Sequence, residues 1–176
     1  FINKLDREAR DPFELLDEIE NVLGIRTCPV NWPIGSGKNF KGVYDRQTKQ
    51  INKFTAANAG MKEVDTQLIE LEDSKLDDYI GFDYADILRN DIELLDGASD
   101  DLDMEKVSAG ELIPVFFGSA LTNFGVQTFL EHFLKMTSSP LKRKTHEGYV
   151  DPMKDEFFSA FVFKIQANMN KEHRDR

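Results

Sequence analysis

Residues 112–121 read L-I-P-V-F-F-G-S-A-L, and this stretch decides the fold. Its first six residues form an unbroken apolar run, which is typical of a strand covered on both faces within a parallel sheet. After the loop that starts at Gly118, apolar residues recur at the spacing i, i+3, i+4, i+7 and i+8: Val126, Phe129, Leu130, Phe133 and Leu134. They predict an amphipathic helix that ends near Pro140. A strand, a loop and a helix in this order predict an α/β protein of the doubly wound class.

The N-terminal residues predict a second strand end and another helix. Phe1-Ile2 has the character of the last piece of a buried strand, so we expect the chain to be an excerpt from a longer polypeptide. Asp11 can accept hydrogen bonds from free amides, Pro12 fits a first helical turn, and Glu14 completes a capping box. The apolar residues that follow lie on one helical stripe, which ends at Gly24: Leu15, Leu16, Ile19, Val22 and Leu23.

The middle of the chain combines predicted strands with a strongly acidic region. Thr27–Ile34 and Gly42–Phe54 are rich in β-branched and aromatic residues, which predicts a strand followed by a hairpin. From Met61 to Glu111 there are 17 acidic and 4 basic side chains, a local charge of −13. A surface helix is expected within this region, because apolar residues recur there at roughly helical spacing: Ile80, Tyr84, Ile87, Leu88, Leu94 and Leu95. Beyond Pro140, residues 141–156 have the composition of a linker, and Phe157–Ile165 predicts a new strand.

Composition excludes several classes of protein. The 176 residues carry a net charge of −10, with no apolar run of the roughly 18 residues that a membrane-spanning helix needs. Cys28 is the only cysteine, so an internal disulfide is impossible, and the cytosol is the expected compartment. The three histidines lack the spacing of a zinc site, and no acidic stretch has the glycine and glutamate positions of a calcium loop.

Asn3-Lys4-Leu5-Asp6 follows the apolar stub, at the end of a strand where doubly wound folds bind ligands. A carboxylate at Asp6 can accept from N1–H and the exocyclic amine of guanine together, whereas the N1 acceptor of adenine would repel it. The stem of Lys4 can lie over a base, and the Asn3 amide can tie neighbouring loops or reach the ring N7. This chemistry predicts a guanine site.

A second loop, Gly118-Ser119-Ala120-Leu121, also ends a buried strand. Its small residues let backbone amides approach a carbonyl such as guanine O6, and Ser119 can brace the loop that carries Asp6. We therefore expect the two loops to converge on one purine.

Gly35-Ser36-Gly37-Lys38-Asn39 invites comparison with a phosphate-binding loop. However, Trp32 stands where the first glycine of that motif belongs, and Asn39 replaces the hydroxyl residue that holds magnesium. We interpret the segment as a glycine-rich turn. The chain thus contains a base-reading half-site without the phosphate-binding half, and it should be inactive alone.

Five stretches together resemble one known family. They are N-K-L-D at 3–6, R-x-x-R-D-P-x-E-L-L-D-E at 7–18, P-x-x-W-P-I-G-x-G-x-x-F-K-G-V-Y at 29–44, P-V-F-F-G-S-A-L-x-N-F-G-V at 114–126 and F-V-F-K-I-Q-A-N-M at 161–169. The chain resembles the bacterial release factor three family of translational GTPases. The resemblance implies that Asn3, Lys4 and Asp6 belong to the fourth guanine-nucleotide motif, and that Ser119, Ala120 and Leu121 belong to the fifth.

The resemblance also implies an architecture. Residues 1–140 would be the C-terminal portion of a doubly wound, P-loop GTPase domain, with an inserted α+β subdomain from about Thr27 to Gly110. Residues 141–156 would be a linker, and 157–176 would begin a second, β-barrel domain with their first strand.

The function implied by the resemblance is the GTP-dependent removal of class-one release factors from the ribosome. GTP and GDP would be the ligands, with Mg²⁺ held only by the full-length protein, and rRNA and ribosomal proteins would be partners; neither a membrane nor DNA is expected. Two alternatives stay open: an elongation factor G-like or ribosome-protection GTPase, and an acidic interaction module that binds no nucleotide.

Overall fold

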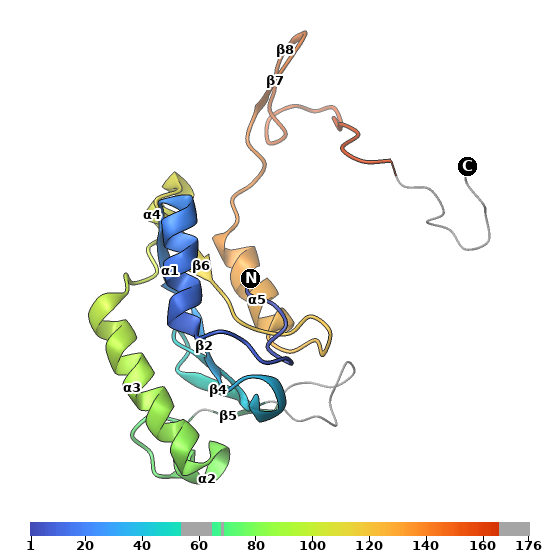
Figure 1. Cartoon of the computed structure of the whole chain (residues 1–176). Coiled ribbons are helices and arrows are strands. Elements are labelled where there is room, and N and C mark those ends of the chain that lie inside the picture. Colours follow the sequence, from blue (N-terminus) through green and yellow to red (C-terminus); the bar gives the residue numbers. More distant parts are fainter. Residues whose placement is uncertain (54–64, 68, 166–176) are drawn as a thin grey trace, which may run out of the picture. The chain divides into compact units, whose positions relative to one another are not determined.

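The computed structural model describes residues 1–53, 65–67 and 69–165 (Figure 1). The chain divides into two compact units, Phe1–Met136 and Thr137–Arg176. The helices and most strands belong to the first unit, which contains both predicted loops.

Parallel strands form the base of the first unit. Strand β1 (Arg26–Pro29) pairs in parallel with β6 (Leu112–Val115), as the apolar run predicted. On the other side of the same chain segment, Ile2 forms a parallel bridge with Phe117. The Ile2 amide donates to the Phe116 carbonyl at 2.7 Å, and the Gly118 amide donates to the Ile2 carbonyl at 3.0 Å. The N-terminal stub is thus a neighbour of the strand that leads to Gly118.

Thr27–Ile34 was predicted to be one strand. The structure divides it into two strands, because the chain changes hydrogen-bonding partners at Val30. The Val30 amide donates to Val115 at 2.8 Å, whereas the Val30 carbonyl accepts from the Arg46 amide at 2.9 Å. Strand β2 (Asn31–Ile34) consequently belongs to a different sheet from β1. Both strands remain extended and buried, so the sequence pattern does not reveal the change.

The second sheet is antiparallel and has the order β2-β3-β4-β5. Its further strands are β3 (Gly42–Asp45), β4 (Gln50–Lys53) and β5 (Asp65–Gln67). The β3–β4 hairpin confirms the prediction for residues 42–53, while Phe54 lies outside the described residues. A short 3-10 helix, η1 (Gly37–Asn39), lies between β2 and β3, so the glycine-rich segment is a turn.

Three further helices accompany these sheets. The acidic region forms α2 (Lys75–Ile80), α3 (Phe82–Ala98) and α4 (Met104–Ala109). The expected surface helix is interrupted at Gly81, whose φ is +96°. On α3 the buried residues are Ala85, Leu88, Ile92 and Leu95, whereas Ile87 and Leu94 are exposed.

Helix α1 (Pro12–Leu23) begins and ends as predicted. Asp11 Oδ1 accepts from the amides of Phe13 and Glu14, and Gly24 ends the helix in the left-handed conformation. The expected return bond of a capping box is replaced by an ion pair, because the Glu14 carboxylate lies 3.5 Å from Arg10 Nε.

An aromatic stack connects α1 with both sheets. The ring of Phe13 packs on Trp32 of β2 at 4.6 Å between centroids, and Trp32 packs edge-on against Phe117 at 5.5 Å. Trp32 also donates its indole N–H to Asp91 Oδ2 of α3 at 2.9 Å. The acidic helix and the parallel strands consequently share one hydrophobic core.

Helix α5 (Val126–Met136) follows β6, which confirms the predicted strand, loop and helix. Phe129 packs on Phe116 and Phe1, whereas Phe133 and Leu134 are exposed. In the described part of the chain, no helix has both the length and the apolar character needed to cross a membrane.

The second unit differs from the sequence prediction. The segment predicted as a linker contains a hairpin of β7 (Arg143–Thr145) and β8 (Gly148–Val150), joined by two residues. Phe157–Ile165 forms no strand, because no described segment pairs with it. The prediction of a strand there is wrong for this structure, and the large apolar side chains of this segment are exposed. Residues 166–176 lie outside the described residues.

Asn31→Ala should destabilise the first unit. The Asn31 amide donates to the Phe117 carbonyl and its oxygen accepts from the Phe117 N–H, at 3.0 and 2.7 Å. Truncation leaves both buried backbone groups unpaired, so we expect a loss of about 2–4 kcal/mol in the free energy of unfolding. Urea denaturation measures this loss, provided that the m-value is the same in the variant and the unmodified protein. The exposed Asn90→Ala serves as the control, and an equal effect of the two variants would contradict this role.

Cys28 should react slowly in the native chain. Burial raises the pKa of its thiol to about 11, so the reactive thiolate is scarce near neutrality. At pH 8 we expect alkylation by iodoacetamide at least about a hundredfold slower than that of glutathione, and recovery of the ordinary rate in urea. Mass spectrometry counts the single adduct. If Cys28 in the native chain were alkylated at a rate within threefold of that of glutathione, its burial in β1 would be contradicted.

Candidate functional site

The two predicted loops lie side by side at the ends of neighbouring parallel strands. Backbone bonds between Ile2 and the Phe116–Gly118 segment bring the chain to this point, and the Leu5 amide then donates to the Gly118 carbonyl at 3.2 Å. Figure 1 shows the N-terminal segment passing beside the loop between β6 and α5. The ends of parallel strands are where ligands bind in this fold class.

Two side chains join the loops directly. Asn3 Oδ1 accepts from the Ala120 amide at 2.8 Å and also from the Lys4 amide at 2.8 Å. The Ser119 hydroxyl donates to Asp6 Oδ1 at 2.6 Å. Asn3 thus ties the loops and Ser119 braces Asp6, as the residue chemistry predicted. The expectation that the two segments converge is confirmed.

The Ser119 loop is closed by its own backbone. The Ser119 amide donates to the Phe124 carbonyl at 3.0 Å, and the Phe124 amide donates to the Ser119 carbonyl at 2.9 Å. Gly118 is required at the strand end, because a Cβ there would lie 2.6 Å from the Phe124 carbonyl oxygen. Ser119 itself is fully buried, so its hydroxyl is fixed in position to hold the Asp6 carboxylate.

The side chains left accessible are those that a ligand could use. Asp6 is partly exposed, and within the described residues its Oδ2 makes no hydrogen bond. Lys4 is exposed and has a φ of +76°, an uncommon conformation for a lysine that recurs at binding sites. Ala120 and Leu121 are also exposed. A carboxylate, a long aliphatic stem and nearby backbone amides suit the edge and face of a guanine.

Sequence reasoning missed one contributor to this arrangement. The turn after β2 contacts the loop of Asp6, because the Gly37 amide donates to the carbonyls of Leu5 and Arg7 at 3.0 and 3.1 Å. The glycines at 35 and 37 were a visible signal of a tight turn, but no local pattern indicates where such a turn docks.

Other titratable groups lie outside these two loops. His132 of α5 places Nε2 2.9 Å from Asp45 Oδ2 at the end of β3, which connects the helix to the hairpin. Across the described ranges, no group of three or more His, Cys, Asp or Glu residues is placed to hold a metal ion. The converging loops are the candidate site.

Residues 1–139 match the family described as the elongation factor Tu GTP binding domain. Among curated proteins, the chain is similar to peptide chain release factor 3 of Symbiobacterium thermophilum, with 52% identity over all 176 residues. It is 51% identical to the protein of that name from Gloeothece citriformis and 50% identical to that of Microcystis aeruginosa.

The alignments cover 100% of this chain and 33%, 32% and 32% of those three relatives. The chain therefore spans about a third of their length. The family match covers both converging loops and the region between them. The chain belongs to the elongation factor Tu GTP binding domain family, and along its whole length it is half-identical to peptide chain release factor 3.

Proposed function

We propose that this chain supplies the guanine-reading loops of a translational GTPase that removes class-one release factors from the ribosome. The single observation that carries the proposal is the joining of the two loops by the Ser119–Asp6 and Asn3–Ala120 hydrogen bonds. Half-identity to peptide chain release factor 3 favours a role in termination over elongation or ribosome protection. The converging loops argue against a module that binds no nucleotide.

Each of the six predicted residues receives a role in this proposal. The Asp6 carboxylate accepts from N1–H and the exocyclic amine of guanine, while the Ser119 hydroxyl donates a further hydrogen bond to Asp6 Oδ1. Lys4 covers one face of the base through its aliphatic stem. Leu121 offers its backbone amide toward O6, the small side chain of Ala120 lets the base approach this loop, and Asn3 keeps the two loops together by accepting the Ala120 N–H.

Hydrolysis of GTP to GDP needs groups beyond these loops. The printed sequence has no phosphate-loop motif, so we assign no catalytic residue in it. In the full-length gene product, phosphates and Mg²⁺ would be bound by other residues. The chain's own contribution is selection of the base and its orientation.

The proposed setting is the cytoplasm, with rRNA and ribosomal proteins as partners besides the release factors. We also propose the domain limits implied by the sequence, with an insertion from about Thr27 to Gly110 and a second domain beginning near 157, although Phe157–Ile165 forms no strand in this structure. Because β1 pairs with β6, the insertion is better placed from Asn31 onward.

Asp6→Asn should change which base is preferred. Asparagine keeps an acceptor for Ser119 but presents an amide N–H₂ toward the base, which repels guanine N1–H and can pair with the additional carbonyl of xanthine. We expect affinity for GDP to fall by about a hundredfold or more, and affinity for xanthosine diphosphate to rise. Competition titrations on the full-length gene product measure both.

The control for this variant is Asp17→Asn on an exposed position of α1. It removes the same charge at a distance from the loops and should leave both affinities within about twofold. If Asp6→Asn retained the guanine preference of the unmodified protein, the assignment of Asp6 would be wrong.

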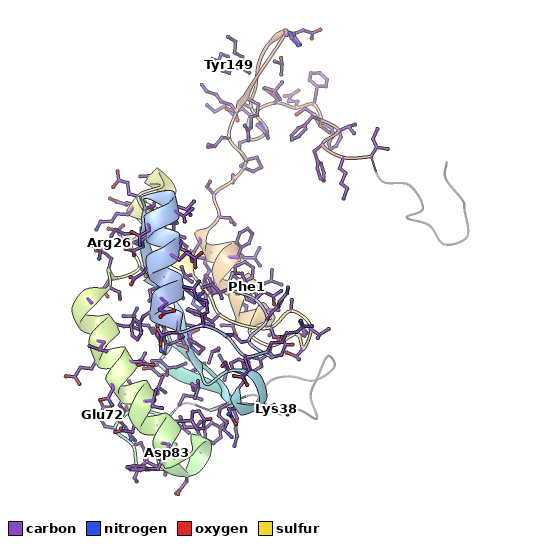
Figure 2. All side chains as sticks on the ribbon, viewed as in Figure 1. Phe1, Arg26, Lys38, Glu72, Asp83 and Tyr149 are labelled. Atoms are coloured by element: carbon purple, nitrogen blue, oxygen red, sulfur yellow. The ribbon has the colours of Figure 1, made fainter. Side chains whose placement is uncertain are left out.

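The acidic region offers a surface to a basic partner on the ribosome. Asp100 and Asp103 are unsuited to testing this, since Asp100 pairs with Arg26 and Asp103 caps α4. Asp83 and Glu93 are exposed on α3, and Figure 2 labels Asp83 near the start of that helix. Reversing their charges leaves caps and ion pairs intact.

Asp83→Lys and Glu93→Lys should each reduce ribosome-stimulated GTP turnover at low salt. Loss of electrostatic steering is expected to lower the apparent association rate by about twofold to fivefold, and the difference should shrink as salt rises. Nucleotide affinity without ribosomes should stay unchanged. Asp17→Lys is the matched reversal on α1, and equal turnover in all three variants would remove the acidic surface from the mechanism.

A further inference from the structure

The turn between β2 and β3 holds the backbone on both sides of Asp6. The Gly37 amide lies 3.0 Å from the Leu5 carbonyl oxygen and 3.1 Å from that of Arg7. These are the carbonyls that flank Asp6 in sequence. The single N–H of Gly37 therefore donates to both carbonyls. This fixes the backbone at Asp6 and thereby the direction of its carboxylate.

Glycine is required at position 37 for two reasons. Its φ of +58° lies in the left-handed region, which disfavours other residues. A Cβ there would also lie 2.4 Å from Glu8 Oε1 and 3.1 Å from the Glu8 backbone nitrogen. The side chain of Glu8 could move away, but the backbone could not without displacing the Asp6 loop. Figure 2 labels the next residue, Lys38, on this turn.

The same turn also reaches the second loop. Phe40, at its end, is buried and packs edge-on against Phe124 at 5.3 Å between ring centroids. Phe124 is the residue whose backbone closes the Ser119 loop. The segment 35–40 thus contacts the Asp6 loop by a hydrogen bond and the Ser119 loop by an aromatic ring.

We infer that the turn 35–40 is a positioning element of the base site, which keeps the two loops in the spacing that a guanine requires. The inference rests on the proposed function. Gly37 and Phe40 are not among the residues assigned to the base, and they act through their contacts with the two loops that are. By linkage, a bound nucleotide must in turn strengthen the contacts of Gly37.

Gly37→Ala and Phe40→Leu, made in the full-length gene product, test this role. We expect fluorescent mant-GDP to dissociate about threefold to tenfold faster from each variant, because one hydrogen bond or one ring contact is lost. The ratio of guanine to xanthine affinity should stay unchanged, since Asp6 is retained. Gly97→Ala is the control, as a Cβ at that position on α3 meets no atom within 4 Å.

A second measurement needs no variant. Hydrogen exchange of the Gly37 amide in the unmodified protein should slow at least about threefold when GDP is added, which a purely structural contact would not show. Slower exchange together with faster dissociation from either variant supports the inference. Wild-type dissociation rates in both variants, or exchange that GDP leaves unchanged, overturn it. If the unmodified protein binds guanine and xanthine nucleotides equally, the proposed function itself fails.

Discussion

The structure depends on one short backbone segment, Phe116–Gly118, which is shared by two neighbours. Its N–H and C=O groups alternate in direction, as they do in any strand. Phe116 and Gly118 bond Ile2 on one side, while Phe117 bonds the side chain of Asn31 on the other. The backbone N–H and C=O groups of Phe116–Gly118 therefore fix the positions of both Ile2 and Asn31. The two candidate loops leave from this point, and their separation follows from it.

The Asn31 side chain provides hydrogen bonds to Phe117 at the point where the chain passes from one sheet to the other. When the chain turns from β1 into β2, the backbone at Asn31 no longer faces Phe117, and two buried polar groups would lack partners. A side-chain amide carries one donor and one acceptor, so it can replace a strand residue at this position. The parallel ladder therefore continues to the beginning of the Ser119 loop, and the antiparallel sheet can begin without loss of hydrogen bonding.

The sequence was sufficient to predict elements whose pattern is local, and the convergence of the loops followed from the rules for parallel strands. The cap at Asp11 and the stripe of α1 need only neighbouring residues. The split at Val30 and the strandless Phe157–Ile165 could not be predicted, because each depends on which distant segment offers a hydrogen-bonding partner. The docking of Gly37 was missed for the same reason.

The antiparallel sheet and its acidic helices are held to the parallel strands by chemically different contacts. Asn31 bonds Phe117, the turn at Gly37 bonds the Asp6 loop, and Asp45 meets His132 on α5. Trp32 adds a fourth link, because it bonds Asp91 of α3 and packs against Phe117 of the parallel part. The acidic helix and the base-reading loops therefore belong to one compact unit with a shared hydrophobic core, although they are far apart in sequence.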